Sequence, residues 1–123
     1  MNKPIAIRTL GNGVVVEFFD QSNRYYGDFY RVKIIAVATI PLLKSTLPED
    51  LYKFAATYPD CVKYERSLER MGVVSSSVQK VVQTLVDGFI ESVGFYLEKG
   101  SFAENLLRKD MLDSSTPRQS FYI

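Results

Sequence analysis

One stretch of the sequence decides the fold: Phe29-Tyr30-Arg31-Val32-Lys33-Ile34-Ile35-Ala36-Val37-Ala38-Thr39-Ile40. Every second residue of this stretch is apolar or aromatic: Tyr30, Val32, Ile34, Ala36, Ala38 and Ile40. Successive side chains of a strand point to opposite faces, so the pattern predicts a long β-strand that Pro41 ends. The other face carries Arg31, Lys33 and Thr39 together with Phe29, Ile35 and Val37, which makes it too apolar for full exposure.

Two shorter strands are expected before this stretch. The segments Ile5–Leu10 and Val14–Phe19 suit strands, and Gly11-Asn12-Gly13 between them is a strong hairpin signal. We expect Val14 to lie opposite Val32 and Val16 opposite Tyr30, because this register gives one continuous apolar face. The same register places Glu17 diagonally near Arg31 on the other face. The polar segment Asp20–Asp28 then connects the second and third strands.

The second half of the chain predicts helices around one ambiguous segment. A short helix is expected from about Pro48 to Thr57, opened by capping-box spacing over Thr46–Glu49. Residues 61–71 fit a helix by propensity, and they also alternate as a strand that covers an edge of the sheet. The clearest helix spans residues 78–97, where a wide apolar stripe recurs at helical spacing after a cap at Ser76–Gln79. Gly100 ends it, and a short helix follows to about Met111.

These patterns predict an α+β fold. We expect an antiparallel β-meander of three to four strands with a long amphipathic helix packed on one face and short flanking helices. Residues 1–112 form the single domain, and residues 113–123 form a flexible C-terminal tail. The apolar content of 46% among 123 residues is ample for one core.

The chain lacks the residues that most catalytic and metal sites use. It contains no histidine and a single cysteine, Cys61. Ser–His–Asp triads, Cys–His pairs and a structural zinc site within one chain are therefore excluded. We therefore favour a protein that is not an enzyme and has no cofactor or metal site. The alternative left open is an enzyme in which Asp20 and Asp28 form an acid–base pair or bind Mg²⁺ with Asn23.

Charge and hydropathy indicate a cytoplasmic protein without a membrane segment. The formal net charge is +1, from 15 basic and 14 acidic residues, which argues against nucleic acid as a partner. The beginning of the chain is interrupted by Arg8, Gly11 and Gly13, unlike a signal peptide, and no apolar run is long enough for a membrane span. A lone cysteine fits a reducing compartment.

The connection at residues 20–28 and the residue that follows it on the long strand concentrate the candidate ligand-binding groups. These candidates are Asp20, Asn23, Arg24, Tyr25, Tyr26, Asp28 and Arg31. An arginine can hold a phosphate or carboxylate by a bidentate contact, and tyrosines can stack on a base or ring. A hairpin loop explains the same residues, because Asp and Asn bond local backbone groups, Gly27 supplies a bulge and Arg24 can pair with Asp20 or Asp28.

The wider stretch Phe18–Val32, which includes Asp20-Gln21-Ser22-Asn23-Arg24-Tyr25-Tyr26-Gly27-Asp28, resembles small uncharacterised bacterial domains when taken with Leu85-Val86-Asp87-Gly88-Phe89. This resemblance covers most of the chain and implies no activity. It favours a strand over residues 62–70.

One irregularity interrupts the apolar stripe of the long helix. Gly88 and Phe95 lie off the stripe, and Phe95 is expected to face outward with Ser92. An exposed aromatic beside small residues can mark a contact with another chain. The alternative is that the C-terminal helix, with Phe102, Leu106 and Leu107, folds back over Phe95.

Two functions follow from the sequence as hypotheses. The first is a non-enzymatic binding or scaffolding module that acts as a homodimer, because the second face of the sheet, or the edge beside it, needs cover. The second is a small-molecule or nucleotide sensor that uses the basic and aromatic connection at residues 20–28. No protein partner, ligand or reaction is indicated by the residues alone.

Overall fold

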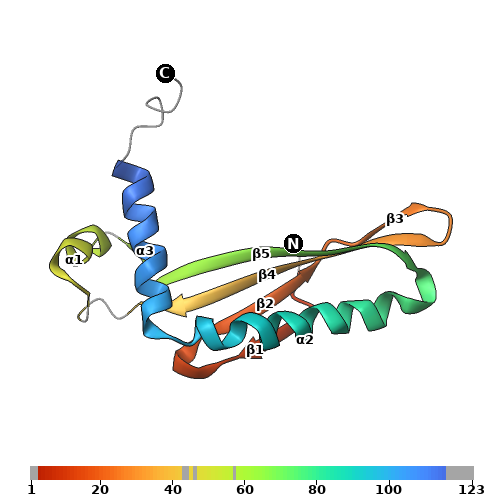
Figure 1. The fold of residues 1–123 in the computed structure, drawn as a ribbon, viewed down its shortest axis with the longest axis horizontal. Coiled ribbons are helices and arrows are strands. Elements are labelled where there is room, and N and C mark those ends of the chain that lie inside the picture. The colour runs from red at the N-terminus through yellow and green to blue at the C-terminus, as the bar shows by residue number, and fades with distance from the viewer. Residues whose placement is uncertain (1–2, 43–44, 46, 57, 116–123) are drawn as a thin grey trace, which may run out of the picture.

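The computed structural model describes residues 3–42, 45, 47–56 and 58–115. The α+β class is confirmed, with five antiparallel strands and three helices among these residues (Figure 1). The strands are β1 (Ala6–Thr9), β2 (Val15–Asp20), β3 (Asn23–Tyr26), β4 (Phe29–Pro41) and β5 (Cys61–Val74). The helices are α1 (Glu49–Ala55), α2 (Val78–Leu97) and α3 (Gly100–Ser115).

The sheet is built around β4. Strand β5 pairs along the full length of one edge of β4, while β2 and β3 follow each other along the other edge and β1 pairs with β2. Helix α2 runs along one face of this sheet, and α1 and α3 stand at the end opposite β3 (Figure 1). We call the face opposite α2 the open face, because no helix among the described residues lies on it.

The core lies between the sheet and α2. The side chains of Val16, Phe18, Ile34, Ala36 and Ala38 are fully buried on the helix side. The register pairs Val16 with Ala38 and Phe18 with Ala36, so apolar residues of neighbouring strands stand side by side. The predicted assignment of the alternating residues of β4 to a buried face is confirmed.

The predicted register between the second and third strands is wrong. Val16 lies opposite Ala38 rather than Tyr30, and Glu17 lies opposite Val37, away from Arg31. The physical reason is that the polar segment after β2 is not a loop. The backbone N–H of Gln21 donates to the carbonyl of Lys33 at 2.8 Å, and β3 then continues the pairing along β4 to a turn at Gly27-Asp28. The hairpin is therefore longer than expected.

The ambiguous residues 61–71 form part of strand β5, not a helix. Helix-forming residues adopt the strand because each one pairs with β4, from Cys61 opposite Pro41 to Val74 opposite Phe29. A bulge interrupts the pairing near Gly72, whose φ of 70° suits a residue without a Cβ. No described strand pairs with the outer edge of β5.

Helix α3 turns away from α2 and joins the end of the sheet to α1. The ring of Phe102 on α3 meets that of Tyr64 on β5 edge to face, with centroids 5.4 Å apart. Phe95 is 66% exposed, so it faces outward as expected and the alternative, a fold-back of the C-terminal helix over it, does not occur. Helix α3 continues through Ser115, and the rest of the predicted tail lies outside the described residues, as does Thr46 of the expected capping box.

Helix α2 begins without the capping hydrogen bond that its sequence predicts. Ser77 occupies the N-cap position of α2, but its side chain makes no capping hydrogen bond there.

None of the helices in the described part of the chain is both long and apolar enough to cross a membrane.

Candidate functional site

The seven candidate ligand-binding residues lie along one projecting hairpin. We call β3, the Gly27-Asp28 turn and residues 29–31 of β4 the hairpin arm, and it forms the end of the sheet farthest from α1 and α3 (Figure 1). Asn23, Arg24, Tyr25 and Tyr26 make up β3, and Asp28 lies in the turn. Asp20 ends β2 where the arm begins, and Arg31 lies on β4 opposite Asn23.

The base of the hairpin arm is held by local hydrogen bonds of the kind that turns use. The Asp20 carboxylate accepts a hydrogen bond from the backbone N–H of Ser22 at 2.8 Å. The Ser22 hydroxyl in turn accepts one from the backbone N–H of Lys33 at 2.9 Å. These bonds bend the chain without ending its pairing with β4, so Asp20 has a structural task here.

The candidate residues do not converge on a binding pocket. Arg24 lies opposite Tyr30 and Asn23 opposite Arg31, so neighbouring candidates alternate between the two faces of the arm. The Arg31 guanidinium is already paired with the Glu69 carboxylate on β5. Neither of the two hollows described below is lined by a candidate residue. The sensor hypothesis therefore stays a prediction without a cavity at its residues.

The tip of the hairpin arm carries an apolar row that the sequence did not reveal. Tyr26 lies opposite Phe29, and Phe29 lies opposite Val74 of β5, so the three side chains stand side by side on the open face. They are 74%, 41% and 37% exposed, respectively. Val74 is distant in sequence from the arm, and only the strand pairing of residues 61–74 could have brought it into this row.

The open face carries a second, larger apolar zone near the middle of the sheet. We call this set the central apolar zone: Ile5, Ile7, Val15, Phe19, Ile35 and Val37. Ile5 and Ile7 are 46% and 54% exposed, and the other four are half-buried by their neighbours in the sheet alone. The predicted excess of apolar residues on this face is thus present, with no helix of the described residues to cover it.

Charged residues of the open face lie in a regular pattern around this zone. The cross-strand neighbours of Val37 are Glu17 on β2 and Glu65 on β5. Four residues earlier on β4, Lys33 lies opposite Glu69. Among the described residues, the carboxylates of Glu17 and Glu65 and the ammonium of Lys33 form no ion pair, whereas Glu69 is paired with Arg31.

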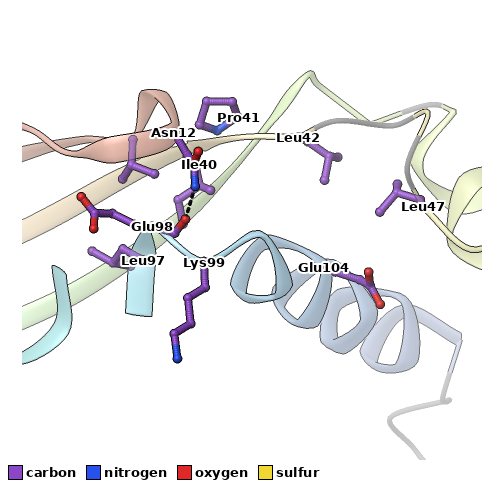
Figure 2. A pocket seen from close by; sticks show the side chains of 10 residues that line it. Asn12, Ile40, Pro41, Leu42, Leu47, Leu97, Glu98, Lys99 and Glu104 are labelled. Carbon is purple, nitrogen blue, oxygen red and sulfur yellow. Dashed lines mark hydrogen bonds between the residues drawn. The ribbon is translucent and has the colours of Figure 1, made fainter. Parts of the chain in front are cut away.

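A cavity of about 480 Å³ lies at the other end of the molecule, where the end of β4 meets the junction of α2 and α3 (Figure 2). Its wall is mainly apolar and consists of Val14, Ile40, Pro41, Leu42, Leu47 and Leu97. Asn12, Glu98, Lys99 and Glu104 complete the lining. Cavities of this size accommodate small organic ligands in other proteins.

The polar groups of this cavity are already engaged with the protein. The Glu98 carboxylate accepts a hydrogen bond from the backbone N–H of Gly11 at 2.6 Å, and the Asn12 amide donates to the Glu98 carbonyl (Figure 2). The Lys99 ammonium lies 4.6 Å from the centre of the Phe95 ring, and its side chain points away from Leu42 and Leu47. The Glu104 carboxylate pairs with Arg108. The cavity therefore suits an apolar ligand better than a charged one.

A second hollow of about 290 Å³ separates β5 from α2. Arg66, Leu68 and Arg70 line it from the strand, and Thr84, Gly88 and Ser92 are among the residues that line it from the helix. No ion pair of Arg66 or Arg70 occurs among the residues that the structure describes.

Two acidic groups of the described residues, Asp50 and Asp110, take part in contacts between α3 and the α1 region. No group of three or more Asp, Glu or Cys side chains in that part of the chain is arranged to hold a metal ion. A hydrogen bond from Arg108 on α3 holds the pKa of Asp50 on α1 below its ordinary value. A hydrogen bond to Asp110 raises the pKa of Tyr58 to about 12, with burial as the second cause. Both contacts tie α3 to the α1 region, which is a structural role.

Comparisons with known proteins add no family. No model of a protein family matches the chain, and searches of curated proteins and of solved structures found no match.

Proposed function

We propose that this protein is a non-enzymatic binding or scaffolding module that works as a homodimer, with the open face of the sheet buried between two copies. The observation that carries the proposal is the central apolar zone, on a face that no helix of the described residues covers. Apolar zones of this kind on a surface are typical of contacts between chains.

The dimensions of the open face favour a second sheet as its cover. Strands at about 4.8 Å spacing and about 3.3 Å per residue give the face a flat area of roughly 600 Å². A standard interface takes about 800 Å² of accessible surface from each partner, which a pleated face of this extent can supply. A single helix is about 10 Å wide and covers about half of the width of four strands. A second copy of the chain offers a face of matching size and composition.

Measurement of mass in solution tests the proposal directly. At micromolar concentration, sedimentation equilibrium is expected to give twice the 14.0 kDa of one chain. Ile35→Asp, in the middle of the central apolar zone, is expected to give a monomer that keeps its circular dichroism spectrum. Phe95→Asp also replaces an apolar side chain with aspartate, at an exposed position on α2, and is expected to leave the dimer intact. A monomeric wild-type protein would refute the proposal.

A second candidate function, binding of an apolar small molecule, is favoured by the cavity of about 480 Å³ beside Ile40 and Leu97. The neutral fluorescent probe N-phenyl-1-naphthylamine is expected to bind there. Leu47→Trp narrows the cavity and is expected to weaken probe binding, whereas Leu112→Trp, at an exposed position on α3, serves as the control. Equal probe fluorescence with both variants and the wild type would contradict this function.

A further inference from the structure

The charges on the open face specify how a second copy can lie on it, and this inference rests on the proposed homodimer. Three rows of side chains cross the face at successive outward positions of β4. The first row contains Lys33 and Glu69, the second contains Phe19, Ile35 and Ser67, and the third contains Glu17, Val37 and Glu65. Arg31 pairs with the Glu69 carboxylate, so the second row separates the unpaired Lys33 from the unpaired Glu17 and Glu65.

Lys33, Glu17 and Glu65 do not neutralise one another within one chain. Lys33 is four residues from Val37 along β4, so its row lies about 13 Å from the row of Glu17 and Glu65. None of the three forms an ion pair among the described residues. Burial of an unpaired carboxylate or ammonium between two sheets is costly. A face-to-face dimer therefore has to bring each of these groups to an opposite charge on the other copy.

Only one of the two simple two-fold arrangements brings Lys33 to acidic residues of the other copy. When the axis runs along the strands, each row faces itself, and Glu17 and Glu65 meet the same two acids of the partner subunit. Like charges held together across an interface cost several kcal/mol. When the axis runs across the strands at Ile35, the first row faces the third row. Lys33 then faces Val37 of the partner subunit, with Glu17 and Glu65 of the partner subunit on its two sides. Glu65 of the partner subunit also faces Glu69, whose negative charge is balanced by Arg31.

We propose that two copies stack with their strands antiparallel and with the two-fold axis at Ile35, so that Lys33 of each copy sits between Glu17 and Glu65 of the other. Phe19 and Ile35 lie at the axis and meet their own copies. Each dimer contains the charge contact twice, as two-fold symmetry requires. Aligned sheets rotate by about 30° on packing, which moves groups two residues from the axis by only about 3 Å, within the reach of a lysine.

The same arrangement accounts for the exposed apolar row at the tip of the hairpin arm. Phe29 precedes Ile35 by six residues and Pro41 follows it by six, so the axis at Ile35 brings Phe29 toward the Pro41 end of the partner subunit's sheet, where the rotation of about 30° displaces the two residues by about 10 Å. Tyr26 and Val74 flank Phe29 in this row, and all three are exposed in the single chain. Pro41 is exposed as well. The arm thus gains cover at the far end of the partner's sheet.

Charge reversal of single residues and mixing of the variants test the arrangement. Lys33→Glu and Glu17→Lys are each expected to weaken self-association about tenfold or more, because each places like charges together. A mixture of the two variants is expected to form heterodimers by native mass spectrometry, because Lys33 of one variant then faces the native Glu17 of the other, and the two introduced residues also face each other. Lys80→Glu, the same change on the solvent side of α2, is expected to leave self-association unchanged.

The outcomes separate this inference from the proposed function. A wild-type monomer overturns both. A wild-type dimer whose two charge variants self-associate normally, or fail to pair with each other in the mixture, overturns the antiparallel arrangement and leaves the homodimer standing. If a reversal variant does not fold, Lys33→Gln and Glu17→Gln replace it. The wild-type dimer is then expected to weaken with added salt and the neutral variants are expected to lose that dependence, whereas equal salt dependence overturns the arrangement.

Discussion

The rings of Phe18 and Phe89 meet edge to face, with centroids 5.8 Å apart and planes at 87°. Phe18 comes from β2 and Phe89 from α2, so this contact joins the sheet to the helix that covers it. Both side chains are almost completely buried. The pair therefore marks the centre of the core between the two layers.

Phe89→Ala is expected to lower the free energy of unfolding by about 3–5 kcal/mol, because it removes buried surface and leaves a cavity beside Phe18. Urea denaturation measures the change. Phe95→Ala removes the same atoms from an exposed position of α2, where the cation–π contact with Lys99 and the edge-to-face contact with Tyr96 are lost, and is expected to cost less than about 1 kcal/mol. Equal losses in the two variants would contradict the described placement of α2.

Asn12, at the turn between β1 and β2, contributes to stability both through its backbone conformation and through a side-chain hydrogen bond. Its φ of 59° is a left-handed conformation, and its side chain donates a hydrogen bond to the Glu98 carbonyl. Asn12→Gly keeps the backbone free to adopt this φ and is expected to cost about 1 kcal/mol for the lost bond. Asn12→Ala also adds backbone strain and is expected to cost about 1–2 kcal/mol more. A higher melting temperature for Asn12→Ala than for Asn12→Gly would contradict the strain assigned to the backbone of Asn12.

Two glycines are expected to respond in opposite directions to the same substitution. Gly88 lies exposed within α2, and a Cβ there meets no atom within 4 Å, so Gly88→Ala is expected to stabilise the protein by about 0.5–1 kcal/mol. Gly72 has a φ of 70° at the bulge of β5, so Gly72→Ala is expected to destabilise it by about 1–2 kcal/mol. Melting temperatures that move in the same direction would count against one of the two conformations.

The contact of Tyr58 with Asp110 predicts a loss of stability at alkaline pH. The hydrogen bond raises the pKa of Tyr58 from 10.0 to about 12, so the protonated phenol is favoured in the folded chain. The stabilisation is complete below pH 10.0 and disappears as the pH rises toward about 12. Its size is expected to be about 1 kcal/mol or less, because the pair lies near solvent.

Variants of two tyrosines isolate this effect. Tyr58→Phe is expected to be less stable than the wild type at about pH 9, with the difference vanishing near about pH 12. Tyr52→Phe, at a 52% exposed position of α1, serves as the control and is expected to show no such pH dependence. A difference for Tyr58→Phe that stays constant across this range would contradict the raised pKa.

The alternation of β4 was sufficient to predict the class of fold and the buried face, because a period of two residues records which side chains face the core. It did not predict the register. Turn-forming residues after Asp20 indicated a loop, yet the hydrogen bonds of Ser22 and Gln21 with Lys33 keep the chain paired with β4. Residues 61–71 show the same limit, since pairing with β4 overrides their helical propensity.

The candidate site was predicted less well than the fold. The seven polar and aromatic residues from Asp20 to Arg31 do lie along one hairpin, but residue types alone do not state which face of a strand each occupies. The rows that combine Glu17 with Glu65, or Phe29 with Val74, depend on the pairing of β4 with its two neighbours. Such rows become visible only when the register is known.

The outer edge of β5 is an edge to which a strand of another chain could add. The outer edge of β5 (Cys61–Val74) pairs with no further strand of the described chain. Unpaired backbone donors and acceptors at such an edge can pair with the edge strand of another copy. Five ionic side chains, Lys63, Glu65, Arg66, Glu69 and Arg70, occupy this edge. A further strand paired with this edge would bring like charges of the two strands together or would desolvate these charged side chains. The charged side chains of β5 therefore disfavour the pairing of another strand with this edge.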